Sequence, residues 1–184
     1  MQGYGATLFD TPVGRCGLAW SGRGVTALQL PEETPEATRT RLLKRAGAPI
    51  ERQPPSAIAD VIEQVVALLN GVAIDLTGVA LDMDRIHEFE RRVYETARFI
   101  PCGETRTYGE IARAIGEPDS ARRVGQALGR NPYALIVPCH RVVAAGGKSG
   151  GFSAGGGVIT KLRLLEIERL ATGARDDGAQ MRLL

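Results

Sequence analysis

The spacing of apolar residues divides the chain into a β-rich first part and a mainly helical second part. Three short apolar runs, at 6–9, 16–20 and 25–30, are separated by turns rich in glycine and proline, and they predict three strands. Helical spacing predicts helices over 36–45 and 58–69, and we expect a further strand over 72–81. In the second part, Phe89, Val93 and Ala97 recur at helical spacing, which predicts a helix with one face in the core.

These elements indicate an α/β (α+β) fold of two domains. We place the boundary near 82–85, so that residues 1–83 form an N-terminal α/β domain and residues 86–172 a mainly helical C-terminal domain. Residues 173–184 carry no strong pattern and are expected to form a tail. The 184 residues, of which 43% are hydrophobic and 24% charged, are enough to bury a core, which excludes a disordered chain.

A helix-turn-helix is predicted in the second part. Thr107 and Glu110 have the spacing of a capping box, which predicts a helix from there to about residue 115. A turn at 117–119 follows, and a second helix runs from Ser120 to the proline-containing pair at 131–132. Its expected buried face consists of Ala121, Val124, Gly125 and Leu128. Its other face carries Arg122, Arg123, Gln126, Gly129 and Arg130. Such a face suits a phosphate backbone, although an ordinary surface helix with a few arginines remains an alternative.

The charge distribution favours an anionic partner. The net charge is only +2, but residues 120–165 contain no Asp or Glu. The basic residues there are Arg122, Arg123, Arg130, Arg141, Lys148, Lys161 and Arg163. A segment of one sign within a folded domain predicts contact with nucleic acid, and a solvated basic face is the alternative.

Cysteine and histidine usage excludes several classes of protein. Cys16, Cys102 and Cys139 are scattered and odd in number, which argues against a disulfide framework. The only histidines are His87 and His140, so we expect no metal site and no cofactor. No apolar run is long enough to cross a membrane and the N-terminus does not resemble a secretory signal, so we expect a cytoplasmic protein.

A candidate nucleophile lies between two apolar segments. The run at 133–137 precedes Cys139 and His140, and a second apolar run follows. A thiolate is the reactive form of cysteine, and a histidine oriented by a carboxylate can supply it. The carboxylate is expected on the last helix, over 161–170, where the helical wheel leaves both Glu166 and Glu168 open. A buried structural cysteine beside a locally bonded histidine is the alternative. The glycine-rich segment 146–157 is expected to be a loop over a substrate.

Several motifs together resemble the O6-alkylguanine-DNA alkyltransferases. They lie at 106–112, 122–125, 131–132 and 137–142, and the last contains Pro-Cys-His-Arg-Val, the active-site signature of that family. The resemblance covers roughly residues 86–170, whereas the first domain resembles the family's ribonuclease-H-like α/β domain only weakly. It implies DNA repair by single, irreversible transfer of an alkyl group from O6-alkylguanine, and also O4-alkylthymine, in double-stranded DNA to the protein itself. It further implies a monomer that needs no protein partner and flips the damaged base out of the helix.

The resemblance also implies a role for individual residues. Cys139 matches the alkyl acceptor, His140 the base that activates it through a water, and Glu168 the carboxylate that orients this histidine. Asn131 matches a residue that ties the second helix to the active-site turn, Tyr108 one that hydrogen-bonds the flipped guanine, and Arg122 the finger that fills the gap in the duplex. The other matches are Val142, Ser153 and Phe152 in the guanine pocket, with Phe152 where many members have Tyr, and Ala121, Gly125 and Gly129 at the minor groove.

Three other functions remain as alternatives. An alkyltransferase-like module would bind damaged DNA without transfer, but such modules lack the acceptor that Cys139 provides here. A thiol hydrolase would use Cys139 and His140 with turnover and would give no role to Arg122. A transcription factor would read bases with the second helix, usually as a dimer.

Overall fold

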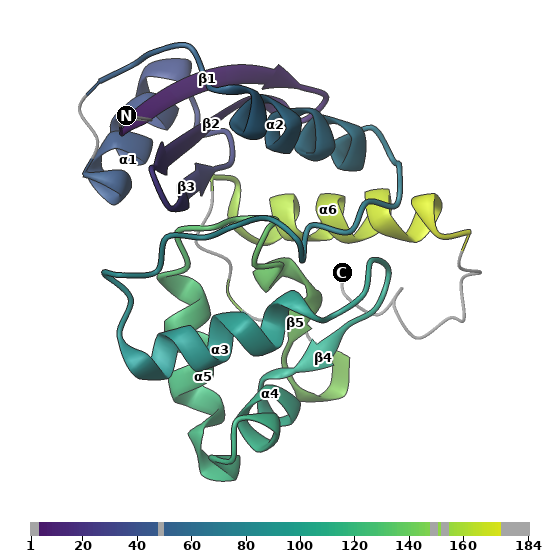
Figure 1. Cartoon of the computed structure of the whole chain (residues 1–184). Coiled ribbons are helices and arrows are strands. Elements are labelled where there is room, and N and C mark those ends of the chain that lie inside the picture. Colours follow the sequence, from purple (N-terminus) through teal and green to yellow (C-terminus); the bar gives the residue numbers. More distant parts are fainter. Residues whose placement is uncertain (1–3, 48–49, 148–150, 152–154, 174–184) are drawn as a thin grey trace.

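The computed structural model describes residues 4–47, 50–147, 151 and 155–173 (Figure 1). Three strands, β1 (Gly5–Thr11), β2 (Gly14–Ser21) and β3 (Gly24–Gln29), are followed by helices α1 (Pro35–Ala46) and α2 (Ser56–Leu69). The later elements are α3 (Glu88–Arg98), β4 (Arg106–Thr107), α4 (Tyr108–Ala114), η1 (Pro118–Ser120), α5 (Ala121–Gly129), η2 (Cys139–Arg141), β5 (Val142–Val143), η3 (Ala145–Gly147) and α6 (Gly157–Ala171). Within the described part of the chain, none of the helices has the length and apolar character that a bilayer crossing requires.

The three predicted strands form an antiparallel sheet in the order β1-β2-β3. Alternation along β2 sends Cys16, Leu18 and Trp20 into the main core and Gly17 and Ala19 to the opposite face, which α1 covers. Gly17 is needed there, because a Cβ atom at this position would lie 2.7 Å from the side chain of Leu42 on α1. The small residues of this face therefore let α1 pack closely against the sheet.

The expected strand over 72–81 is wrong. This segment contains turns, and its Leu81 makes one isolated parallel bridge to Val25 of β3. The backbone N–H of Thr77 donates to the Asp75 carboxylate at 2.8 Å, and this local bond competes with strand pairing. Arg98 of α3 holds the segment from the other side by donating to the carbonyl oxygens of Thr77 and Val79, each at 2.7 Å. The apolar residues whose spacing suggested a strand instead pack as part of an irregular connection.

The second part of the chain is built from α3, α4, α5 and the two-stranded parallel sheet β4-β5, with α6 lying between these elements and the N-terminal sheet (Figure 1). The first helix of the predicted helix-turn-helix is confirmed as α4. The Thr107 hydroxyl accepts from the Glu110 N–H, and the Glu110 carboxylate accepts from the Thr107 N–H, so the capping box is complete. After the turn, η1 leads directly into α5. Tyr94 of α3 anchors α5 by donating to the Ala127 carbonyl at 2.9 Å.

The buried face of α5 differs from the prediction by part of a turn. Val124 and Leu128 are buried as expected, and Ala127 joins them, whereas Ala121 and Gly125 are half-buried. The helix is therefore rotated so that Gly125 faces the ring of Tyr108, which a Cβ atom at residue 125 would approach to 3.7 Å. The last helix also begins earlier than expected, at Gly157 instead of residue 161.

Candidate active site and nucleic-acid interface

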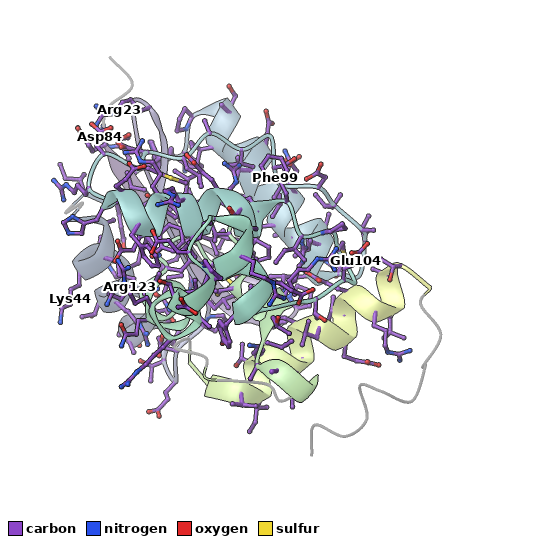
Figure 2. All side chains as sticks on the ribbon, turned by 90° about the horizontal axis from the view of Figure 1, so that it is seen from below. Arg23, Lys44, Asp84, Phe99, Glu104 and Arg123 are labelled. Atoms are coloured by element: carbon purple, nitrogen blue, oxygen red, sulfur yellow. The ribbon has the colours of Figure 1, made fainter. Side chains whose placement is uncertain are left out.

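The outer face of α5 carries the predicted DNA-contacting side chains, and they are not equivalent. Arg122, Arg123, Gln126, Gly129 and Arg130 are all exposed. Arg123 bonds Glu117 at 3.0 Å and lies 3.9 Å over the ring of Phe89, on the side of the molecule that α4 and α5 form (Figure 2). Arg130 bonds Glu90 at 2.7 Å. Arg122 is different, since it makes no hydrogen bond or ion pair with any residue that the structure describes.

The predicted nucleophile lies in a tight, buried turn. Residues 133–137 are buried as predicted, but the chain that follows them is not extended, because Cys139–Arg141 form one turn of 3-10 helix. Leu135 has a φ of 67°, a conformation that costs a residue with a branched side chain about 1–3 kcal/mol. Two short backbone bonds hold it, from Ile136 to Ala134 and from Val137 to Tyr133, each 2.8 Å long. Strain of this kind is typical of functional turns.

Asn131 connects α5 to this turn. Its side-chain amide donates to the Val137 carbonyl at 2.9 Å, and its side-chain oxygen accepts from the Tyr133 N–H at 2.9 Å. The Asn131 side chain also lowers the pKa of the neighbouring Cys139 thiol. A buried amide that bonds two backbone groups of the turn fixes the position of the turn relative to the helix.

His140 and Glu168 form a buried hydrogen-bonded pair. His140 Nε2 lies 2.7 Å from Glu168 Oε1, while Arg141 Nε and Nη2 donate to the same carboxylate at 2.9 and 2.8 Å. Burial raises the pKa of Glu168, but His140 and Arg141 outweigh this and hold it at about 2. Of the two carboxylates that the wheel left open, Glu168 faces the turn, and Glu166 lies on the surface and bonds Arg169 at 2.8 Å.

The thiol of Cys139 holds its proton more tightly than a free thiol, because its pKa is raised. Burial raises its pKa, although the Asn131 side chain and the positive charges of Lys161 and Arg45 oppose the rise. A base must therefore remove the proton when the cysteine reacts. His140 Nδ1 is buried and has no hydrogen-bond partner among the described residues, so this atom is available to take part in the proton transfer.

Lys161 is a site residue that the sequence did not identify. We counted it among the basic residues directed at an anionic partner, but its side chain is fully buried and Nζ donates to the Val142 carbonyl at 2.6 Å. Burial lowers the pKa of Lys161 to about 8, while Cys139 raises it. Arg141 is likewise internal, so two of the seven basic residues are not on the surface, and Lys148 lies outside the described residues. The signal that could have found Lys161 was its place one turn before the buried Leu164.

The predicted guanine pocket is described only in part. Tyr108 is half-buried at the start of α4, with Lys161 Nζ 6.0 Å from its ring centre, and burial raises the pKa of its hydroxyl. Val142 is buried, and β5 pairs it with Arg106 beside Tyr108, so the sheet joins the two sides of the site. Phe152 and Ser153 lie outside the described residues.

A helix-turn-helix joined through one asparagine to a half-buried cysteine, with a buried histidine and glutamate beside it, is the arrangement expected of a DNA-binding protein with a reactive thiol. Comparison with known proteins agrees with this class. Residues 88–170 match the family model of the 6-O-methylguanine DNA methyltransferase DNA-binding domain.

Similar proteins extend the match to most of the chain. The methylated-DNA–protein-cysteine methyltransferase of Mycolicibacterium paratuberculosis is 42% identical over 87% of this chain and 89% of its own, and that of Methanothermobacter thermautotrophicus is 38% identical over 83% and 78%. The crystal structure of Mycobacterium tuberculosis OGT in complex with DNA has a TM-score of 0.70 and 41% identity, covering 89% of this chain and 92% of that one. The chain belongs to the family of methylated-DNA–protein-cysteine methyltransferases. Its mixed α/β fold is that of the alkyltransferase structures.

Proposed function

We propose that Cys139 is the acceptor in direct DNA repair and takes the alkyl group from O6-alkylguanine. Repair by alkyl transfer to a cysteine of the protein is the activity of the family to which the chain belongs. The observation that carries the assignment to this residue is that His140, in the same turn as Cys139, pairs with the buried Glu168 of α6. Cys16 lies beside the Thr11 hydroxyl, and burial raises its pKa to about 12. Burial and the nearby Glu168 raise the pKa of Cys102, and neither of these cysteines lies in the turn of His140.

The protonation of the thiol sets the order of events. Glu168 stays ionised because of its low pKa, and it fixes the ring of His140 through Nε2. His140 then takes the Cys139 proton through its unpaired Nδ1, with one water between them. The sulfur attacks the alkyl carbon, a carbon–sulfur bond forms, and the bond from that carbon to O6 breaks. The electron pair goes to the guanine, which is protonated as it leaves.

The thiol can reach the damaged base only after this base leaves the stack of the DNA duplex, which costs a few kcal/mol. Arg122 is exposed near the start of α5 and has no partner among the described residues, so it is free to enter the duplex in place of the extruded base. The minor groove can approach α5 closely because the residues facing it are small: Ala121, Gly125 and Gly129. Contacts to the DNA phosphate backbone are supplied by Arg123, Gln126 and Arg130. Tyr108, Val142, Phe152 and Ser153 are proposed to line the guanine pocket.

The product is a thioether, and the proposed site has no group that would cleave it. The protein should therefore act once, which separates it from a thiol hydrolase. A damage-binding module without transfer is disfavoured, since such a module would not need the thiol of Cys139. O4-alkylthymine is proposed as a second substrate.

The remaining assignments are also proposals. We divide the chain into an N-terminal domain of residues 1–83, whose sheet and helices are compatible with a ribonuclease-H-like arrangement, a C-terminal domain of residues 86–172, and a tail. We further propose that the protein acts as a monomer, without a protein partner, in the cytoplasm. Sedimentation of the protein alone and with an alkylated duplex would test whether it is a monomer.

The decisive experiment is the intact mass of the protein after reaction with a duplex that contains O6-methylguanine. One methyl group should be gained, and peptide mapping should place it on Cys139. The Cys139→Ala variant should gain none, and Cys102→Ala should behave as wild type. Methylation of another cysteine, or repair that continues beyond one equivalent of protein, would contradict the proposal.

A further inference from the structure

Arg45 of the N-terminal helix α1 reaches the active-site turn. Its Nη1 donates to the backbone carbonyl of Asn131 at 3.3 Å, across 86 positions of sequence. The three other basic residues of α1 behave differently. Arg39 pairs with Glu51, Arg41 bonds Glu32 at 2.7 Å, and Lys44 is exposed at the edge of the molecule (Figure 2).

The position of Arg45 is electrostatically unfavourable on its own. The side chain is half-buried, and burial together with the neighbouring charge of Arg41 lowers its pKa, while Cys139, Glu32 and Tyr94 raise it. A guanidinium group remains protonated at neutral pH even so. An arginine at the end of a helix could avoid this cost by extending into water. The bond to Asn131 and the attraction to Cys139 are what this position gains instead.

The residue that Arg45 contacts is the one that holds the nucleophile. Asn131 bonds Val137 and Tyr133, and its side chain lowers the pKa of the Cys139 thiol. The N-terminal sheet supports the same segment, because the Leu28 N–H of β3 donates to the Pro132 carbonyl at 2.8 Å and the Leu28 carbonyl accepts from Ala134. Arg45 therefore completes a contact between the N-terminal part of the chain and the backbone on which Cys139 is carried.

The charges around Cys139 come from several elements. Lys161 of α6 and Arg45 of α1 are the cations that lower the pKa of its thiol, and His140 lies in the same turn. Tyr94 of α3 and Tyr108 of α4 also interact with it electrostatically, and burial with a nearby thiolate keeps both hydroxyls protonated. When the thiolate forms, Arg45 thus places a permanent positive charge near it from the N-terminal part of the chain, while the charge of Lys161 is lost near pH 8.

We propose that Arg45 is a positioning residue for alkyl transfer, which fixes the Asn131 backbone beneath the Cys139 turn and stabilises the negative charge that develops on the sulfur. The inference rests on the proposed role of Cys139 as acceptor. It gives the N-terminal part of the chain a direct part in the reaction, which does not depend on DNA contact.

The test measures transfer from free O6-benzylguanine and from an O6-methylguanine duplex by wild type, Arg45→Gln and Arg45→Lys. Arg39→Gln is the matched control, since Arg39 is an exposed residue of the same helix that pairs with Glu51. The rate for Arg45→Gln should fall about tenfold on both substrates, and the pH midpoint of its rate should move upward because the thiolate loses a neighbouring cation. Arg45→Lys should recover part of the shift, and Arg39→Gln should match wild type.

Three outcomes would overturn the inference. A wild-type rate and pH midpoint in Arg45→Gln would show that the contact is incidental. A loss confined to the duplex would make Arg45 a DNA contact, and a fall in stability with an unchanged pH midpoint would make it structural. The stability of each variant is measured by urea unfolding, and rates are compared where all variants are folded. If wild type itself failed to alkylate Cys139, the proposed function would fail, which is a separate result.

Discussion

The buried Glu168 makes a prediction that joins stability to activity. The Glu168→Gln substitution keeps the size of the side chain but removes the charge that faces Arg141 and His140. Breaking a buried ion pair by neutralising one partner leaves the other charge uncompensated, which costs about 3–5 kcal/mol. We therefore expect a large loss of stability at pH 7, together with slower transfer on any substrate because the His140 ring is no longer fixed.

The pKa of Glu168 gives an independent magnitude. It falls from an ordinary value of 4.5 to about 2 on folding. At 1.36 kcal/mol per pH unit, this corresponds to about 3 kcal/mol in favour of the folded state. Because the folded pKa is lower than the unfolded one, this contribution is complete above pH 4.5 and is lost as the pH falls towards 2.

Urea unfolding of wild type and Glu168→Gln between pH 7 and pH 3 measures this contribution. The difference in their free energies of unfolding should be about 3–5 kcal/mol at pH 7 and should shrink as the pH falls below 4.5. Glu166→Gln is the control, because Glu166 lies on the same helix with its side chain 54% exposed and bonds Arg169. It should cost less than about 1 kcal/mol.

The same variants report on activity. Transfer from O6-benzylguanine should slow about a hundredfold in Glu168→Gln and remain unchanged in Glu166→Gln. The reasoning would be refuted if the two variants lost equal stability, or if the difference between wild type and Glu168→Gln did not change with pH.

Two further predictions concern the cations of the site. Arg122→Ala should slow repair of an alkylated duplex strongly but spare reaction with free O6-benzylguanine. Arg123→Ala should have a smaller effect, because the Arg123 side chain already pairs with Glu117. Equal losses on both substrates for Arg122→Ala would rule out a role in base extrusion. Lys161→Met should slow transfer from the free base about tenfold at pH 7. Above pH 8 the two rates should converge, because the pKa of Lys161 is about 8 and wild type loses this cation there. A constant ratio of the two rates from pH 6 to pH 9 would contradict an electrostatic role.

The sequence alone determined much of the local structure, because the relevant signals act between near neighbours. The capping box of Thr107 and Glu110 and the proline after Asn131 set the limits of the helix-turn-helix. Alternation and turns placed the three strands of the first sheet. The segment 72–81 was the exception, because its apolar spacing resembles a strand while the Asp75 side chain favours a turn.

The tertiary structure alone decided which side chains meet at the nucleophile. The helical wheel could not choose between Glu166 and Glu168, since both lie beside apolar residues and only the packing of α6 on the active-site turn separates them. Lys161 and Arg45 were hidden for the same reason. A lysine in a basic segment and an arginine near a helix end have the sequence pattern of surface residues, and their burial depends on contacts with segments 19 and 86 positions away. Long-range packing, which no local pattern encodes, therefore set the charge around Cys139.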